Sequence, residues 1–213
     1  MQHAIEVIRR IGLCTLIGLS GCSLSRGETP QQHYVLGGGR VQRTEAPHPR
    51  LAGLAIGVRR LQLASYLEST SIAVRRDPQE ITLSEFHRWG EPLPGGISRA
   101  VAAYLTAGAP FRAVDVAPWP LREKYDYLIQ LHVLHFEGVA PADPAAREGE
   151  AHLLANWEII RQGDGAVLAR GTTSYRKNGW RVGDYAGLVT LLDTGLHVLS
   201  NDLMASLEKL VVR

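Results

Sequence analysis

The chain has 213 residues, of which 45% are hydrophobic and 21% charged, with 22 glycines, 11 prolines and 2 cysteines. These values are close to those of ordinary globular proteins and exclude a disordered chain, a collagen-like repeat and a disulfide scaffold. The 23 basic and 21 acidic residues leave a formal charge of +2, which is too small to predict binding to nucleic acid. The length fits one domain, or two at most.

The first 22 residues have the pattern of an export signal that ends in a lipid anchor. Arg9 and Arg10 precede a short apolar run over residues 11–19, which is the plan of a secretory signal peptide. This run is too short for a transmembrane helix, which needs about 20 apolar residues. The next residues, Leu19-Ser20-Gly21-Cys22, resemble a bacterial lipobox, whose cysteine is acylated and becomes the new amino terminus. We therefore predict a signal peptide over residues 1–21 and lipidation of Cys22.

An ordinary signal peptide with a chance cysteine is the alternative, and it fits the cysteine positions less well. Cys14 would leave with the signal peptide and Cys22 would carry lipid, so the mature chain would hold neither a free thiol nor a disulfide. The several acyl chains that the lipoprotein resemblance implies would make anchoring effectively permanent. Ser23 is not the aspartate that often marks retention in the inner membrane, so we expect the periplasmic face of the outer membrane. The polar segment 22–33 is predicted to be a flexible tether.

The remaining residues, 34–213, are predicted to form a single domain that begins with short strands and a helix. The short strands are expected over residues 34–36, 54–63, 71–76 and 81–83. A helix that contains Ile97 and Val101 follows, and it stops at Gly108 with Pro110 just beyond. The triplet Gly37-Gly38-Gly39 lacks the spacing of a dinucleotide fingerprint, so we expect a flexible turn there and no cofactor.

The strongest β signal lies in three consecutive segments, 127–136, 151–160 and 166–175. In the second segment the apolar side chains from Leu153 to Ile159 alternate with polar ones, as in a strand with one buried face. The glycine-containing link 162–165 is typical of a hairpin turn. These segments predict an antiparallel meander with one solvent-exposed face.

A long helix is predicted to close the chain over residues 185–211. Its leucines, from Leu188 to Leu210, recur every three or four residues and form one apolar stripe, which must cover a sheet or a partner. The predicted fold class is α/β (α+β): a mixed, largely antiparallel sheet flanked by helices, in a single compact domain with a long C-terminal helix.

A family resemblance rests on a tryptophan motif and on the order of the segments around it. The chain presents Tyr66-Leu67, then Val74-Arg75, then Trp89-Gly90-Glu91-Pro92-Leu93 at the start of a helix, followed by Trp157 in the long hairpin and the leucine-rich closing helix. This order resembles the PqiC/YmbA family of ABC-type transport auxiliary lipoproteins, over about residues 34–210. The resemblance implies a periplasmic domain that is anchored in the outer membrane and is not itself an enzyme. Its partners would be an MCE-type protein, which carries lipid between the two membranes, and an ABC permease with its ATPase.

The tryptophan motif has two interpretations. In the first, Trp89 packs in the core under a helix that starts near Pro94, Pro92 fixes the entry of that helix, and Glu91 favours its positive end. In the second, Trp89 and Leu93 form part of an apolar surface that docks a partner or an acyl chain, since tryptophan is frequent at binding hot spots. Trp89, Glu91, Pro92 and Leu93 are therefore the candidate partner interface.

Catalytic and metal chemistry have little support in the sequence. His132, His135 and His152 could be imagined as metal ligands, but residues i and i+3 of a strand point to opposite faces, and no cysteine or carboxylate completes a set. The nucleophile elbow of serine hydrolases is not present. The pair Arg75-Arg76 should split between the two faces of its strand, and solvated side chains are expected there. We predict neither catalytic residues, nor a metal, nor a cofactor.

The sequence thus favours an accessory lipoprotein of an MCE/ABC-type lipid transport system that acts by binding its partner. Two alternatives stay open. A membrane-tethered hydrolase would show a deep pocket with perturbed titratable groups. A structural lipoprotein would self-assemble through the closing leucine helix. Homo-oligomerisation, for example in a ring around a conduit, is also compatible with the accessory lipoprotein.

Overall fold

The computed structural model describes residues 30–38, 48–120, 124–143 and 145–211, and Gln31–Arg213 forms one compact unit. The predicted signal peptide, Cys22 and most of the predicted tether lie outside the described residues. No helix in the described ranges has both the length and the apolar character needed to cross a membrane.

Three long antiparallel strands form one part of the sheet. β7 (Tyr127–Val139) pairs with β8 (Glu148–Arg161), which in turn pairs with β9 (Val167–Arg181). Each predicted segment is a strand, and each strand extends a few residues beyond the prediction. In the turn between β8 and β9, Gly165 has a φ of 71°, a left-handed conformation that glycine adopts at little cost. The predicted hairpin is confirmed.

The other edge of β7 pairs with three shorter strands, one after another. β2 (Ala55–Val58), β3 (Gln62–Leu63) and β4 (Ser71–Asp77) all run parallel to β7. The predicted strand 54–63 is therefore two strands, interrupted by the exposed arginine pair at 59–60. The antiparallel meander is one part of a mixed sheet, which agrees with the predicted fold class.

Three further strands complete the nine-stranded sheet. β5 (Glu80–Trp89) is antiparallel to β4, β1 (Gln32–Tyr34) is parallel to the end of β5, and β6 (Ala113–Val116) is parallel to β2. β1 begins two residues before the predicted strand 34–36. The last two residues of the predicted tether therefore pair with β5, where the hydroxyl group of Tyr34 lies 2.9 Å from Nδ1 of His87.

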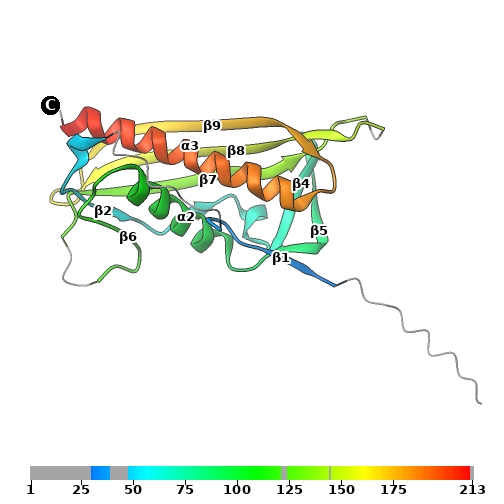
Figure 1. The fold of residues 1–213 in the computed structure, drawn as a ribbon, viewed down its shortest axis with the longest axis horizontal. Helices are drawn as coiled ribbons and strands as arrows, with labels where there is room; N and C mark the ends of the chain where they lie inside the picture. Colours follow the sequence, from blue (N-terminus) through cyan, green and yellow to red (C-terminus); the bar gives the residue numbers. More distant parts are fainter. Residues whose placement is uncertain (1–29, 39–47, 121–123, 144, 212–213) are drawn as a thin grey trace, which may run out of the picture. The chain divides into compact units, whose positions relative to one another are not determined.

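Two helices lie over one face of the sheet (Figure 1). α2 (Leu93–Gly108) packs against α3 (Tyr185–Val211), and α3 also packs on β8 and β9. The end of α2 and both ends of α3 agree with the predictions. The leucines of the predicted stripe from Leu188 to Leu207 are all fully buried. The apolar stripe of α3 thus covers the sheet of its own domain.

The hydrophobic core fills the space between the helices and the sheet. On β8, Leu153, Ala155 and Ile159 are fully buried, and the intervening Asn156 is exposed, as the alternation predicted. Two short 3-10 helices, Pro49–Leu51 and Ser65–Glu68, add Leu51 and Leu67 to this core. His152 is an exception on the polar face of β8, because it is buried as well.

Candidate functional site

The tryptophan motif lies inside the core. Trp89 is 5% exposed and Leu93 is 4% exposed, and the indole ring packs against Phe136 with the ring centres 5.8 Å apart. A side chain buried in this way offers no apolar surface to a partner. The packing interpretation describes both residues, and we do not retain them as a docking surface.

Glu91 and Pro92 mark the start of α2. The helix begins at Leu93, one residue before the predicted start, and Pro92 is its N-cap residue. Glu91 forms an ion pair with Arg99 of the same helix, and its carboxylate lies against Gly96 in the first turn. A negative charge at this position is favourable because the amino end of a helix is positive. These two residues fix the entry into α2.

A carboxylate is fully buried on the face of the sheet that points away from α3. Oε1 of Glu137, on β7, accepts hydrogen bonds from Nε of Arg75 at 2.7 Å and from Nδ1 of His135 at 3.0 Å. Its Oε2 accepts from the hydroxyl group of Tyr66 and from the backbone N–H of Phe136. Burial by itself would raise the pKa of Glu137, but the hydrogen bonds from Tyr66, His135 and Arg75 outweigh it and hold the pKa below its ordinary value. Glu137 is therefore charged, and protein donors occupy both of its oxygens.

A β-bulge brings the histidine side chains onto this face. The pairing of β7 with β8 shifts by one residue between Val133 and His135, so His132 lies opposite Asn156 and His135 lies opposite Leu154. Since the two partners on β8 are two residues apart, His132 and His135 point to the same face. The expectation that they point to opposite faces is wrong for this reason.

His152, on β8, completes the group that we call the Glu137 cluster: Tyr66, Arg75, His135, Glu137 and His152. Its ring stacks on that of His135, with the ring centres 4.5 Å apart, and its Nδ1 has no hydrogen-bond partner among the described residues. Burial, together with the positive charge of Arg176, lowers the pKa of His152 to about 4. The side chain is therefore neutral at physiological pH.

The cluster has the residue types of a metal site, contrary to the sequence argument that no carboxylate completes the set. Ligand atoms of His135, Glu137 and His152 all lie within 4.8 Å of one another. However, Glu137 already binds the guanidinium group of Arg75, and a cation placed there would face this positive charge. The arrangement fits a buried, fully bonded ion pair better than a metal site. The sequence signal for it was Glu137, the single acidic residue of β7, which directly follows the predicted strand 127–136.

A pocket of about 470 Å³ opens beside the cluster. It is lined by Arg75, Arg76, Asp77, Pro78, His135, Val139, Ala140, Ala142, His152 and Arg176. Arg75 is bound to Glu137 and Arg176 to Glu150, so two of the three positive charges are neutralised. Arg76 is exposed, as expected for a solvated side chain, but Arg75 is paired with Glu137 in the cluster instead of solvated. The lining holds no serine, threonine or cysteine that could act as a nucleophile.

A second polar group fastens the start of the domain to both helices. Asp193 of α3 accepts hydrogen bonds from the backbone N–H of Gly37 at 3.0 Å and from the hydroxyl group of Tyr104 of α2 at 2.6 Å. Burial, and then Asp193, raises the pKa of Tyr104, which keeps its proton as a donor. The positive φ of Gly37, 70°, gives the turn that brings this N–H to Asp193. This contact is structural.

Comparison with known proteins gives a family match over most of the chain. Residues 34–204 match the family model described as the ABC-type transport auxiliary lipoprotein component. No curated protein matches the chain.

Solved structures share the fold at low sequence identity. A protein from Xanthomonas campestris is 18% identical, with 81% of this chain and 92% of that chain covered and a TM-score of 0.67. An uncharacterized protein is 16% identical, with 84% and 99% covered and a TM-score of 0.59. A PelC dodecamer from Paraburkholderia phytofirmans is 20% identical, with 72% and 92% covered, but its TM-score of 0.40 is too low to support an argument about assembly. The first two similarities concern the fold alone.

Proposed function

Because the chain belongs to the family of ABC-type transport auxiliary lipoproteins, we propose that it is the accessory lipoprotein of an intermembrane lipid transport system. In this proposal the domain lies in the periplasm, is anchored in the outer membrane, and binds an MCE-type protein that works with an ABC permease and its ATPase. The observation that carries the proposal is the family match over residues 34–204.

Cys22 provides the anchor in this proposal. It follows a signal peptide pattern and stands at the acylated position of the lipobox Leu19-Ser20-Gly21-Cys22. Ser23, in place of aspartate, supports the outer membrane over the inner one. A domain held in this way meets a partner from the opposite membrane in the periplasm.

The domain acts by binding and performs no chemical step. A general base needs a free lone pair that can reach the substrate. Protein donors occupy both oxygens of Glu137, the unpartnered Nδ1 of His152 is buried, and the lining of the adjacent pocket contains no serine, threonine or cysteine. The lowered pKa of Glu137 therefore reflects a buried ion pair, and the lowered pKa of His152 reflects its own burial beside Arg176. This supports an accessory role over the tethered hydrolase.

Self-assembly through the closing helix also has less support. Leu192, Leu199 and Leu207 of the stripe are fully buried inside the domain. An oligomer of this chain would have to use other surfaces.

The test is affinity purification of the full chain, tagged at its carboxyl end, from detergent-solubilised cell envelopes. An MCE-type protein should co-purify, and deletion of the chain should increase envelope permeability. The purified Cys22→Ala chain should still bind the purified MCE-type protein, because the anchor sets location and the domain makes the contact. Recovery of no MCE-type protein, together with unchanged permeability, would contradict the proposal.

A further inference from the structure

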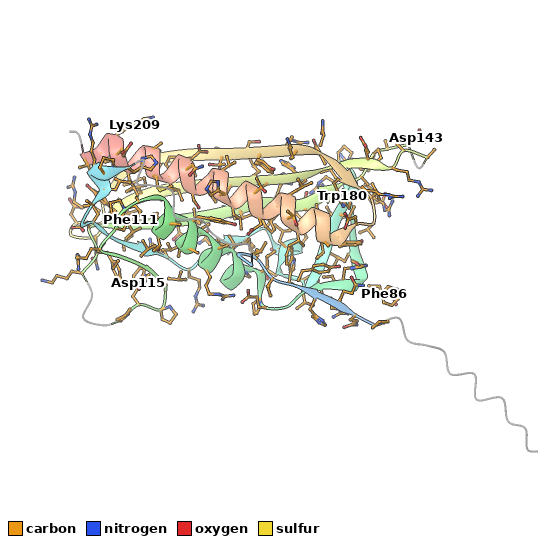
Figure 2. All side chains as sticks on the ribbon, viewed as in Figure 1. Phe86, Phe111, Asp115, Asp143, Trp180 and Lys209 are labelled. Carbon is orange, nitrogen blue, oxygen red and sulfur yellow. The ribbon has the colours of Figure 1, made fainter. Side chains whose placement is uncertain are left out.

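Several exposed apolar side chains lie on or next to the paired strands β1 and β5. Of the five exposed large hydrophobic residues in the described ranges, Leu83 and Phe86 lie on β5 and Val35 directly follows β1, with exposed fractions of 45%, 37% and 56%. Figure 2 shows Phe86 at the end of the domain where β1 begins. The other two, Val167 and Val211, lie at the start of β9 and at the end of α3.

A bulge in β5 turns Phe86 outward. Leu83 pairs with Ala73 of β4 and Arg88 pairs with Ser71, so five steps along β5 correspond to two along β4. The extra residues, including Phe86, have no partner on β4, and the Oγ of Ser84 accepts a hydrogen bond from the backbone N–H of His87 at 3.1 Å within this segment. Bulges commonly re-aim side chains in this way.

Half-buried aromatic side chains with polar atoms lie beside this bulge. The ring of His87 stacks on that of Tyr185, at the start of α3, with the ring centres 4.0 Å apart. Tyr34 of β1 contacts the same histidine through its hydroxyl group. Aromatic rings with one apolar and one polar side are favoured at the boundary between water and lipid.

The length of the tether decides which end of the domain can reach a membrane. Nine residues, 23–31, separate Cys22 from β1. Such a segment spans at most about 35 Å when fully extended, and about 17 Å as a flexible coil. With 27 residues, α3 alone is about 40 Å long. Val167 lies near the far end of α3, because β9 runs antiparallel to α3 and leads into its start (Figure 1). A lipid at Cys22 therefore holds the end that carries β1 closest to the membrane.

We propose that this end of the domain, which we call the β1–β5 end and define by Tyr34, Val35, Leu83, Phe86 and His87, rests on the lipid leaflet that holds Cys22. Phe86 and Leu83 then lie among the lipid headgroups, and the turn between β8 and β9 points away from the membrane. The inference rests on the proposed lipid anchor. The apolar area is small, so the contact orients a domain that is already anchored and does not recruit an unanchored one.

The contact can be measured with a fluorescent label at single positions. The mature chain has no cysteine besides Cys22, so a lipidated Phe86→Cys chain carries one reactive thiol. The label is an environment-sensitive dye, and the labelled protein is reconstituted into vesicles of phosphatidylethanolamine and phosphatidylglycerol. Leu83→Cys provides a second position, and Val167→Cys, with a similar exposed fraction of 39%, is the matched control.

The dye at positions 83 and 86 should shift its emission to the blue on reconstitution and should lose intensity when nitroxide-bearing lipids are included. The dye at position 167 should do neither. If the chain floats with the vesicles but all three labels report water, the inference is overturned and the proposed function stands. If the response at position 86 follows protein density and not the nitroxide lipids, copies of the chain contact each other there, which also overturns it. A chain without lipid at Cys22 would not float with the vesicles, and that result refutes the anchor and this inference together.

Discussion

The Glu137 cluster predicts a large loss of stability for a substitution that changes neither size nor shape. Glu137→Gln removes the negative charge that faces Arg75 and converts one carboxylate oxygen into an NH₂ group. Either orientation of the amide points this group at two donors, because Arg75 and His135 donate to one oxygen while Tyr66 and Phe136 donate to the other. Leaving one partner of a buried ion pair without its counter-charge costs about 3–5 kcal/mol. We expect a loss of unfolding free energy in this range.

The assay is equilibrium unfolding in urea, followed by tryptophan fluorescence, on the mature chain with Cys22→Ala. With an m-value of about 2–3 kcal/mol per molar urea, the midpoint should fall by about 1 to 2.5 M. The matched control is Glu158→Gln on β8, because Glu158 is half-buried and pairs with Arg170, whose side chain is 71% exposed. An exposed pair of this kind contributes less than about 1 kcal/mol. If both variants lose the same free energy, the burial argument for Glu137 is wrong.

Three further changes test other parts of the structure by the same urea assay. Gly171→Ala places a Cβ 2.1 Å from the buried ring of Trp157 and should lower the free energy of unfolding by about 1–3 kcal/mol. A Cβ added at Gly163 has no atom within 4 Å, so Gly163→Ala should lower it by well under 1 kcal/mol. The pKa of His152 is about 4 in the folded chain and 6.5 ordinarily, so the unfolded state binds more protons between these two pH values. The free energy of unfolding should therefore fall by up to about 3 kcal/mol as the pH drops from 6.5 to 4. A flat pH profile, or an equally steep one in His152→Asn, would contradict this. Leu199→Ala should cost about 2–5 kcal/mol without changing the sedimentation profile, since this leucine is fully buried in its own domain; a cost below 1 kcal/mol would refute that packing.

Elements with a strong local pattern could be predicted from the sequence. The helix 185–211 was predicted with its observed ends because its leucines recur at helical spacing, and the helix that ends at Gly108 because proline follows it. The three long strands and the turn 162–165 were predicted from alternation and glycine content. These patterns depend on residues that are close together in the sequence, so they can be recognised without knowing how distant segments pair.

Features that depend on pairing between distant strands could not be predicted. The sequence around Leu134 gives no sign of the bulge that places His132 and His135 on one face. Glu137 acquires its role from Arg75 on a parallel strand, 62 residues away along the chain. Trp89 had two interpretations because a short motif does not reveal whether its side chain is covered.

The central claim is that the mature chain is a lipoprotein held at Cys22. The most direct measurement is the intact mass of the protein purified from outer membranes, compared with that of a Cys22→Ala variant. We predict a chain of residues 22–213 whose mass exceeds that of the polypeptide by its acyl groups, while the variant lacks them and leaves the membrane fraction. An unmodified Cys22, in a chain that fractionates like the variant, would contradict the claim.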